Sequence, residues 1–421
     1  SEPNAGKGRP MIRTRQGSWG SVFGALIALS AVALVLGACS RQAGGGPTPS
    51  PQPERPGPAP SATSMPTSTM DNLAVALLVD RRLLVARLSD GAAIADLPLG
   101  SAVDMPPIDR AGHYLALGQD GDTLLVLVPG SSNDAGQLAV VDIVEAKVAS
   151  AYELPAGTTY GSLATGPATG RVYLFGNRAG GVVVTVLDPA TGAEVTSWTA
   201  READGDDWLV YQGAVPPHQR TLYISYHGRD PTGIDRFAVT PDGLSRCGSA
   251  NPPGVGCIDA HGGLAVDDGG LLVATGSRVI RKVDADGVAR EALDTGLEDH
   301  LLEFVVDYRA GRLYAVVACD VGGGFSAVDV RGTGVLAPPA TPGDWSWEVP
   351  PEPPLVATVG SQACGARLAL GPSPLLVVGR TALPVPRPAP GELLIVDVRS
   401  GEVVRSVPTP AEPVDVLAIA R

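Results

Sequence analysis

The chain has 421 residues, 44% hydrophobic residues and a formal net charge of −13. Residues 1–39 hold four basic residues and one acidic residue, so the remainder of the chain carries a charge of −16. An acidic body repels nucleic acid, and we therefore expect no DNA or RNA partner. The 53 glycines and 39 prolines are typical of a turn-rich all-β protein.

The first segment, residues 1–38, has the layout of an export signal. Arg13 and Arg15 precede an uncharged run at 22–38 that is rich in Ala, Leu and Val. This run is short for a membrane span, which needs about 20 residues. A basic region, an apolar region and small residues at the end are the pattern of a signal peptide. We therefore predict that residues 1–38 are a signal peptide.

The end of this segment, Leu36-Gly37-Ala38-Cys39, resembles the lipobox of bacterial lipoproteins. The resemblance implies that a diacylglyceryl group is attached to the Cys39 thiol and that the chain is cut before this residue. Acyl chains contribute about 0.8 kcal/mol of membrane binding for each buried CH₂ group. We therefore expect a lipid-anchored protein exposed on the extracytoplasmic side of a cell membrane. A plain transmembrane anchor is the alternative.

Residues 39–71 follow as a stretch rich in Pro, Gly and Ser, with almost no large apolar residues. Such a stretch buries too little surface to offset the entropy lost on ordering, and its prolines keep it extended. We predict a tether that holds the folded region away from the membrane. A Pro-rich recognition segment is the alternative.

From residue 72 to residue 421, short apolar runs alternate with turn signals. The clearest unit has expected strands at 162–165, 171–175, 182–188 and 194–199. Similar units recur at intervals of roughly 45–55 residues, and four strands at this period are typical of a β-propeller blade.

The two ends of this region complement each other. Residues 73–97 supply only three strands, whereas 414–420 form a lone strand at the C-terminus. Pairing between them would remove exposed sheet edges. We predict an all-β fold for 72–421: a seven-bladed β-propeller of four-stranded antiparallel blades, closed by the C-terminal strand. Two stacked β-sandwich domains are the alternative.

Four cysteines remain besides Cys39, and an even number in an exported protein suggests two disulfides. Cys247 and Cys257 flank a Gly/Pro-rich loop and form the natural short-range pair. Cys319 and Cys364 would then close a longer loop. The spacing of Cys and His does not match a zinc site, so no metal site is predicted here.

Two strand pairs, 312–317 with 325–330 and 375–378 with 393–402, resemble blades of the YVTN/WD40-like bacterial propeller superfamily. The resemblance implies the fold of residues 72–421. Members of the superfamily include interaction scaffolds, lactonases, lyases and quinoproteins, so the fold leaves both binding and catalysis open.

Histidines and one acidic residue fall near the start of expected innermost strands, close to the central funnel. His113, His261, His300 and Glu303 are the candidate catalytic residues, since imidazole and carboxylate groups can exchange protons at this level. Binding of a cation by these groups, or a solvated polar rim, is the alternative. Five further residues are candidate binding residues near this level: Tyr160, Tyr211, His227, Arg367 and Asp415.

An insertion at 338–354 holds Trp345 and Trp347, which are candidates for contact with a partner or carbohydrate. Tryptophans that cover the side of the propeller are the equally weighted alternative. No cofactor is predicted. A divalent cation such as calcium, at the acidic turn 204–207, is the alternative. The acidic stretch at 120–122 fits a strand-connecting turn in which Gly121 supplies positive φ.

The chain lacks a G-x-S-x-G elbow, a phosphate-binding glycine loop and an H-E-x-x-H motif. We therefore expect a monomeric binding or scaffold lipoprotein for a protein, peptide or glycan. The alternative is an extracytoplasmic hydrolase or lyase, similar to a lactonase, that acts in the central funnel.

Overall fold

A computed structural model describes the chain in residues 72–100, 112–130, 136–166, 169–178, 181–202, 209–216, 221–227, 233–240, 243–249, 264–267, 270–275, 279–284, 289–294, 300–307, 312–320, 325–337, 346–348, 355–360, 366–372, 374–381 and 390–420. The expected signal peptide, Cys39 and the tether lie outside the described residues. Across the described ranges, no helix has the length and apolar character needed to cross a bilayer.

The described residues form an all-β structure of antiparallel sheets, most of them four-stranded. In order of pairing, the first three sheets are β29 (Pro413–Ile419), β1 (Leu73–Leu78), β2 (Arg82–Arg87) and β3 (Ala93–Pro98); β4 (Leu115–Leu117), β5 (Thr123–Val128), β6 (Gln137–Asp142) and β7 (Lys147–Glu153); and β8 (Thr158–Gly166), β9 (Arg171–Arg178), β10 (Gly181–Leu187) and β11 (Glu194–Glu202).

The later sheets repeat this plan, with one exception that has a fifth strand, β24 (Leu355–Gly360). They are β12 (Leu209–Ala214), β13 (Thr221–His227), β14 (Gly233–Thr240) and β15 (Gly243–Ser249); β16 (Leu264–Asp267), β17 (Gly270–Thr275), β18 (Val279–Asp284) and β19 (Ala289–Asp294); β20 (His300–Asp307), β21 (Arg312–Asp320), β22 (Phe325–Ala337) and β23 (Ser346–Glu348); and β25 (Ala366–Leu370), β26 (Leu375–Thr381), β27 (Gly391–Asp397) and β28 (Glu402–Thr409).

Position within a sheet decides how a strand is buried. The inner strands β1 and β10 are buried along their whole length, and their sequences LAVALL and GVVVTVL are apolar throughout or nearly so. The outermost strand β7 instead alternates between exposed and partly buried residues. Continuous apolar runs fit strands covered on both faces, and alternation fits strands with one solvated face. The core therefore lies between the faces of neighbouring sheets.

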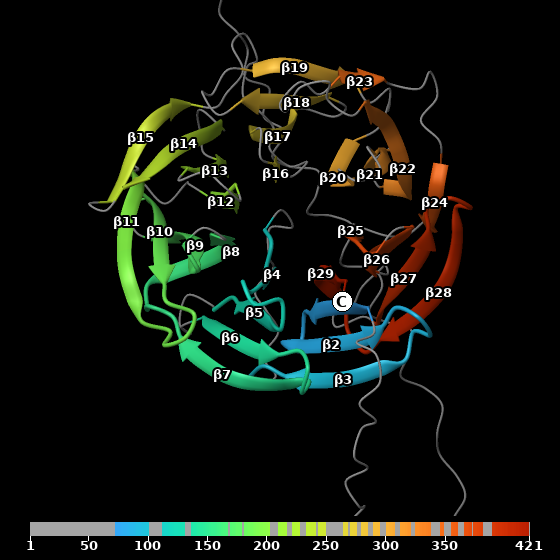
Figure 1. The fold of residues 1–421 in the computed structure, drawn as a ribbon, viewed down its shortest axis with the longest axis horizontal. Helices are drawn as coiled ribbons and strands as arrows, with labels where there is room; N and C mark the ends of the chain where they lie inside the picture. Colours follow the sequence, from blue (N-terminus) through green and yellow to red (C-terminus); the bar gives the residue numbers. More distant parts are fainter. Residues whose placement is uncertain are drawn as a thin grey trace, which may run out of the picture. The chain divides into compact units, whose positions relative to one another are not determined.

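One edge strand of each sheet contacts its counterpart in the neighbouring sheets. We call β29, β4, β8, β12, β16, β20 and β25 the central strands, because Figure 1 shows them nearest the middle of the arrangement of sheets. Each contacts the next in this order, and β25 contacts β29. The C-terminal strand β29 pairs antiparallel with β1, from Leu73 opposite Ile419 to Leu77 opposite Asp415, as expected for residues 414–420.

The sheet of β20 to β24 departs from the expected four strands. Its third strand, β22, has 13 residues and pairs with β23 at one end and β24 at the other. The insertion after β22 supplies β23, in which Trp347 lies opposite Leu336. A long strand can carry two partners end to end, so this sheet gains one strand.

Candidate functional site

Central strands share an irregularity at one register position. In β8, β12, β20 and β29 the pairing with the neighbouring strand shifts by one residue, at Gly161, Tyr211, Leu302 and Val414. A β-bulge of this kind bends the strand and re-aims the next side chain. The residue after each shift pairs with the fifth residue of the neighbouring strand, and so does Arg367 of the regular strand β25. We call this the shared position, and it holds Ser162, Gln212, Glu303, Arg367 and Asp415.

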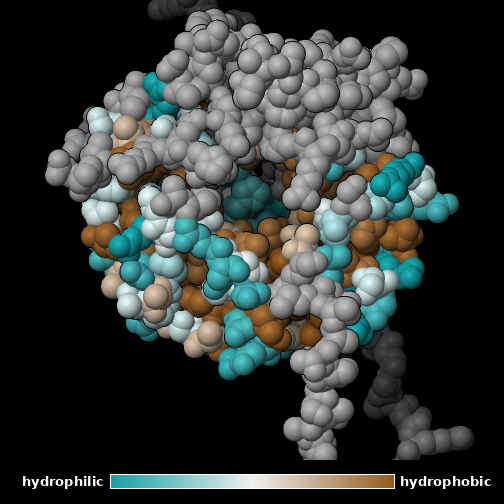
Figure 2. All heavy atoms as spheres, viewed as in Figure 1, coloured by the Kyte–Doolittle hydropathy of each residue, from teal (hydrophilic) through white to brown (hydrophobic). Residues whose placement is uncertain are grey.

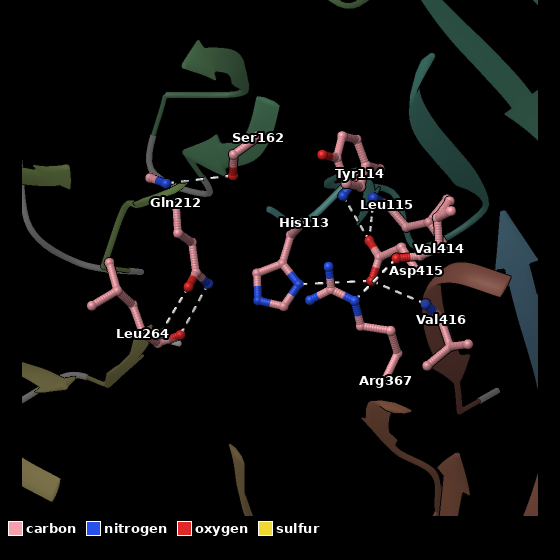
Figure 3. A network of polar contacts seen from close by, with 11 residues as sticks. His113, Tyr114, Leu115, Ser162, Gln212, Leu264, Arg367, Val414, Asp415 and Val416 are labelled. Carbon is pink, nitrogen blue, oxygen red and sulfur yellow. Dashed lines mark hydrogen bonds and ion pairs between the residues drawn. The ribbon is translucent and has the colours of Figure 1, made fainter. Parts of the chain in front are cut away.

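Asp415 is the most deeply engaged of these residues. Its side chain is 2% exposed, and its Oδ2 atom accepts hydrogen bonds from the backbone N–H groups of Tyr114 at 2.6 Å and Leu115 at 2.9 Å. Its Oδ1 atom accepts from the N–H of Val416 at 2.9 Å (Figure 3). These donors compensate for the removal of the carboxylate from water. Asp415 therefore joins β29 to the start of β4.

Arg367 joins β29 to the sheet on its other side. Its side chain is buried, and its Nε atom donates a hydrogen bond to the carbonyl oxygen of Val414 at 3.0 Å (Figure 3). β29 is thus bonded to β25 through Arg367 and to β4 through Asp415. Both contacts join a side chain to a backbone group of the neighbouring sheet.

The same kind of contact links the next central strands. Gln212 of β12 is buried, donates from Nε2 to the carbonyl of Leu264 at 3.2 Å, and accepts from the Leu264 N–H at 2.8 Å. Ser162 of β8 accepts from the Gly213 N–H at 3.4 Å. Between β4 and β8 a backbone contact is present, because the Leu163 N–H donates to the carbonyl of His113 at 2.8 Å.

His113 lies beside this network with a partly exposed side chain. Its Nδ1 atom is 3.8 Å from Oδ1 of Asp415, an ion pair when the imidazole is protonated, and 37% of its side chain is exposed. Figure 3 shows the imidazole directed toward Asp415. Figure 2 shows a hollow at the middle of the viewed face with hydrophilic residues in it. An imidazole beside a buried carboxylate can exchange protons with a bound molecule.

Tyr160, an expected binding residue, lies in the core of its sheet. It is 2% exposed, and its hydroxyl shares a hydrogen bond with the Thr185 hydroxyl at 2.9 Å. Burial raises the pKa of the Tyr160 hydroxyl, because the phenolate form loses its hydration. The phenol group thus packs and bonds within the sheet rather than reaching a surface.

Other expected residues are placed only by their backbone or lie outside the described residues. Tyr211 lies on β12, His227 ends β13, and both His300 and Glu303 lie on β20, while their side chains are outside the description. The same holds for Trp347 on β23. The remaining expected residues outside the described ranges are His261, Trp345, Cys257, Cys364 and the acidic turn 204–207.

The two expected disulfides therefore stay predictions. Cys247 lies on β15 and Cys319 on β21, with only their backbones described, and each expected partner lies outside the described ranges. Within the parts that the structure describes, no group of three or more His, Cys, Asp or Glu residues is arranged to hold a metal ion.

The acidic stretch 120–122 is the strand-connecting turn that the sequence predicts. Asp120 accepts hydrogen bonds from the N–H groups of Asp122 and Thr123 and from the Thr123 hydroxyl, and Gly121 has a φ of 73°. The Thr123 hydroxyl, helped by the two N–H groups, holds the pKa of the Asp120 carboxyl below its usual value. Its carboxylate is thus used within the turn.

A separate pocket of about 390 Å³ lies between the second and third sheets and was missed by the sequence analysis. Leu125, Val140 and Val172 contribute apolar lining, while Asp120 and Arg171 contribute polar groups. Arg171 also pairs with Asp188 at 2.7 Å. Because the pocket forms only where two sheets meet, no run of neighbouring residues in the sequence indicates it.

No protein-family model and no curated protein matches this chain. Solved structures, in contrast, are similar to it. A functionally unknown protein from Desulfotomaculum acetoxidans has a TM-score of 0.54 at 13% identity, covering 80% of this chain and 95% of that chain. The dihydro-heme d1 dehydrogenase NirN has a TM-score of 0.50 at 16% identity, covering 83% and 76%.

U3-55K has a TM-score of 0.50 at 12% identity, covering 73% of this chain and 84% of that chain. NirN and U3-55K are β-propeller proteins, and the structural neighbours include both binding scaffolds and enzymes. At these identities the likeness shows the fold alone. The chain is therefore all-β, with several four-stranded antiparallel sheets and β-propeller proteins as its structural neighbours.

Proposed function

We propose that this protein is an exported lipoprotein whose folded region, residues 72–421, is a seven-bladed β-propeller closed by β29, and that it binds a protein, peptide or glycan partner. The signal-like residues 1–38, the lipobox ending at Cys39 and the Pro-rich tether support the anchoring. The pairing of β29 with β1 and the contact of β25 with β29 support the closed ring.

The hydrogen bonds that the central polar side chains make to neighbouring sheets are the observation that supports the binding role. Asp415, Arg367 and Gln212 are buried and hydrogen-bonded to backbone groups of neighbouring sheets. A general acid or base must present its proton or lone pair to the substrate. These three side chains instead hold sheets together, so we assign recognition to residues outside this network, including the insertion with Trp345 and Trp347, whose strand β23 lies at the outer edge of its sheet.

An enzyme acting in the central funnel is the second candidate, favoured by His113. Its imidazole is partly exposed and lies 3.8 Å from the buried carboxylate of Asp415. A carboxylate in this place can orient a catalytic imidazole and stabilise its protonated form. This candidate implies hydrolysis of a lactone, an activity that the resemblance to the propeller superfamily also suggests.

Membrane fractionation tests the anchoring. Cys39→Ser removes the thiol that would carry the lipid, whereas Ser40→Ala changes the next residue and serves as the matched control. We expect the serine variant to leave the membrane fraction or to remain uncut, and the control to behave as the unchanged protein. A processed Cys39→Ser variant that stays fully in the membrane fraction would refute the lipid anchor.

The released Cys39→Ser protein allows the two functional candidates to be separated. It is screened against peptide and glycan arrays and against a panel of lactones. The binding role predicts capture that falls with Trp345→Ala or Trp347→Ala and persists with His113→Ala. The enzymatic role predicts lactone hydrolysis that His113→Ala abolishes. Hydrolysis of this kind, without any captured ligand, would replace the first candidate by the second.

A further inference from the structure

We propose that the shared position is a repeated latch between sheets, and that two of its charged members, Arg367 and Asp415, hold strand β29 in the fold from both sides. The inference goes beyond the proposed function, because it rests on contacts within the folded region and not on any partner. The shared position holds residues of several types, so its role is inferred from register and not from residue type.

Equivalent register is the first support for the latch. Ser162, Gln212 and Asp415 each follow a β-bulge and each pair with the fifth residue of the neighbouring strand. All three side chains bond to a backbone group of the next sheet around the centre. A bulge re-aims the side chain that follows it, which explains how Ser162, Gln212 and Asp415 reach a different sheet. Arg367 reaches the next sheet from a regular strand by its longer side chain.

The place of β29 is the second support. Its partners lie far away in sequence: Asp415 is 301 residues from Tyr114. Bringing segments so far apart in sequence together costs loop-closure entropy, which the contacts of β29 must offset. Arg367 and Asp415, which have described bonds to or from β29, contribute to offsetting this cost. Charge-assisted hydrogen bonds are about twice as strong as neutral ones.

Complementary chemistry is the third support. Asp415 supplies acceptors to two N–H groups of the neighbouring sheet, whereas Arg367 supplies a donor to the carbonyl of Val414. Each side chain thus matches the backbone group that it meets. Glu303 occupies the same register position on β20, the strand next to β25.

Hydrogen exchange measured by mass spectrometry tests the latch on the full chain. Asp415→Asn keeps the shape of the side chain but replaces one acceptor oxygen by a donor. Glu402→Gln makes the same chemical change at an exposed residue of the outer strand β28 and is the control. We expect amides of β29 and of residues 114–115 to exchange about tenfold faster or more in Asp415→Asn. Amides of β9 and β10 and the control variant should be unchanged.

Two outcomes would overturn the proposal: exchange in β29 that stays at the level of the unchanged protein, or exchange that rises equally in every sheet. If Asp415→Asn does not fold, Arg367→Lys provides the second measurement, because it keeps the charge but lacks the Nε donor. Faster exchange confined to β29 supports the latch, and unchanged exchange there contradicts it.

Discussion

Gln212 offers a sharp test of the bonds between central strands, because a single-atom change makes its contact depend on pH. The carboxamide donates to the carbonyl of Leu264 and accepts from the Leu264 N–H, with 2% of the side chain exposed. In Gln212→Glu, a protonated carboxyl can make both hydrogen bonds. An ionised carboxylate can accept from the N–H but faces the carbonyl with a second acceptor.

The magnitude follows from these two bonds. Leaving one buried backbone group unsatisfied costs about 1–3 kcal/mol, and burial of the charge adds to this cost. We expect Gln212→Glu to lower the free energy of unfolding by about 2–4 kcal/mol at pH 7. Burial and the carbonyl favour the neutral acid, so the pKa of the new carboxyl is raised in the folded state. The variant is therefore close to the unchanged protein below a pH of about 4.3 and loses stability as the pH rises through the raised folded pKa.

Urea denaturation at a series of pH values measures this difference, with the unchanged protein at the same pH as reference. Gln212→Met is the matched control, since it has a similar shape, lacks both polar groups and should be destabilised equally at all pH values. A Gln212→Glu variant that loses the same stability at acidic and neutral pH would show that the side chain does not bridge β12 to β16 in the way described.

Three further substitutions have defined outcomes. Tyr160→Phe removes a buried hydroxyl bond and should lower the unfolding free energy by about 0.5–1.5 kcal/mol in urea denaturation; ultraviolet titration should place the phenol pKa of the folded protein above its usual value. Gly213→Ala places a Cβ atom against the ring of Phe175, so calorimetry should show a free energy of unfolding that is lower by about 1–3 kcal/mol or more. Asp120→Asn should lower the free energy of unfolding by under about 1 kcal/mol above pH 4, because the Asp120 carboxylate is largely exposed. The pKa of this carboxyl is lowered in the folded protein. In acid denaturation, the difference in stability from the unchanged protein should therefore vanish as the pH falls through the lowered pKa.

Local signals made most strands predictable. The expected strand at 171–175 is the start of β9, 182–188 overlaps β10 closely, and 194–199 is the first part of β11. In each case an apolar run ends at turn residues, and the signal lies within a few neighbouring residues. The pairing of the last strand with the first sheet was predictable for a different reason: the first segment had three strands where the repeat requires four.

Contacts that depend on register were not predictable. From the sequence we expect Glu303, Arg367 and Asp415 at one level near the centre, with their side chains facing a ligand. Arg367 and Asp415 instead bond to backbone groups of neighbouring sheets. Tyr160 was grouped with them, yet it precedes a bulge and lies in the core, while Ser162 after the bulge points to the next sheet. A shift of one residue reverses the face on which a side chain lies.

The shared position tolerates different residue types because its requirement is geometric. Ser162 meets an N–H that lies close, Gln212 spans both polar groups of one residue, and Arg367 reaches a carbonyl. What must be kept is a hydrogen-bonding group of suitable reach, opposite in character to the backbone group it meets. A polar residue near the centre of such a fold is therefore weak evidence of catalysis until its backbone partners are known. By this criterion the partly exposed His113 remains a candidate for chemistry, and the buried members of the shared position do not.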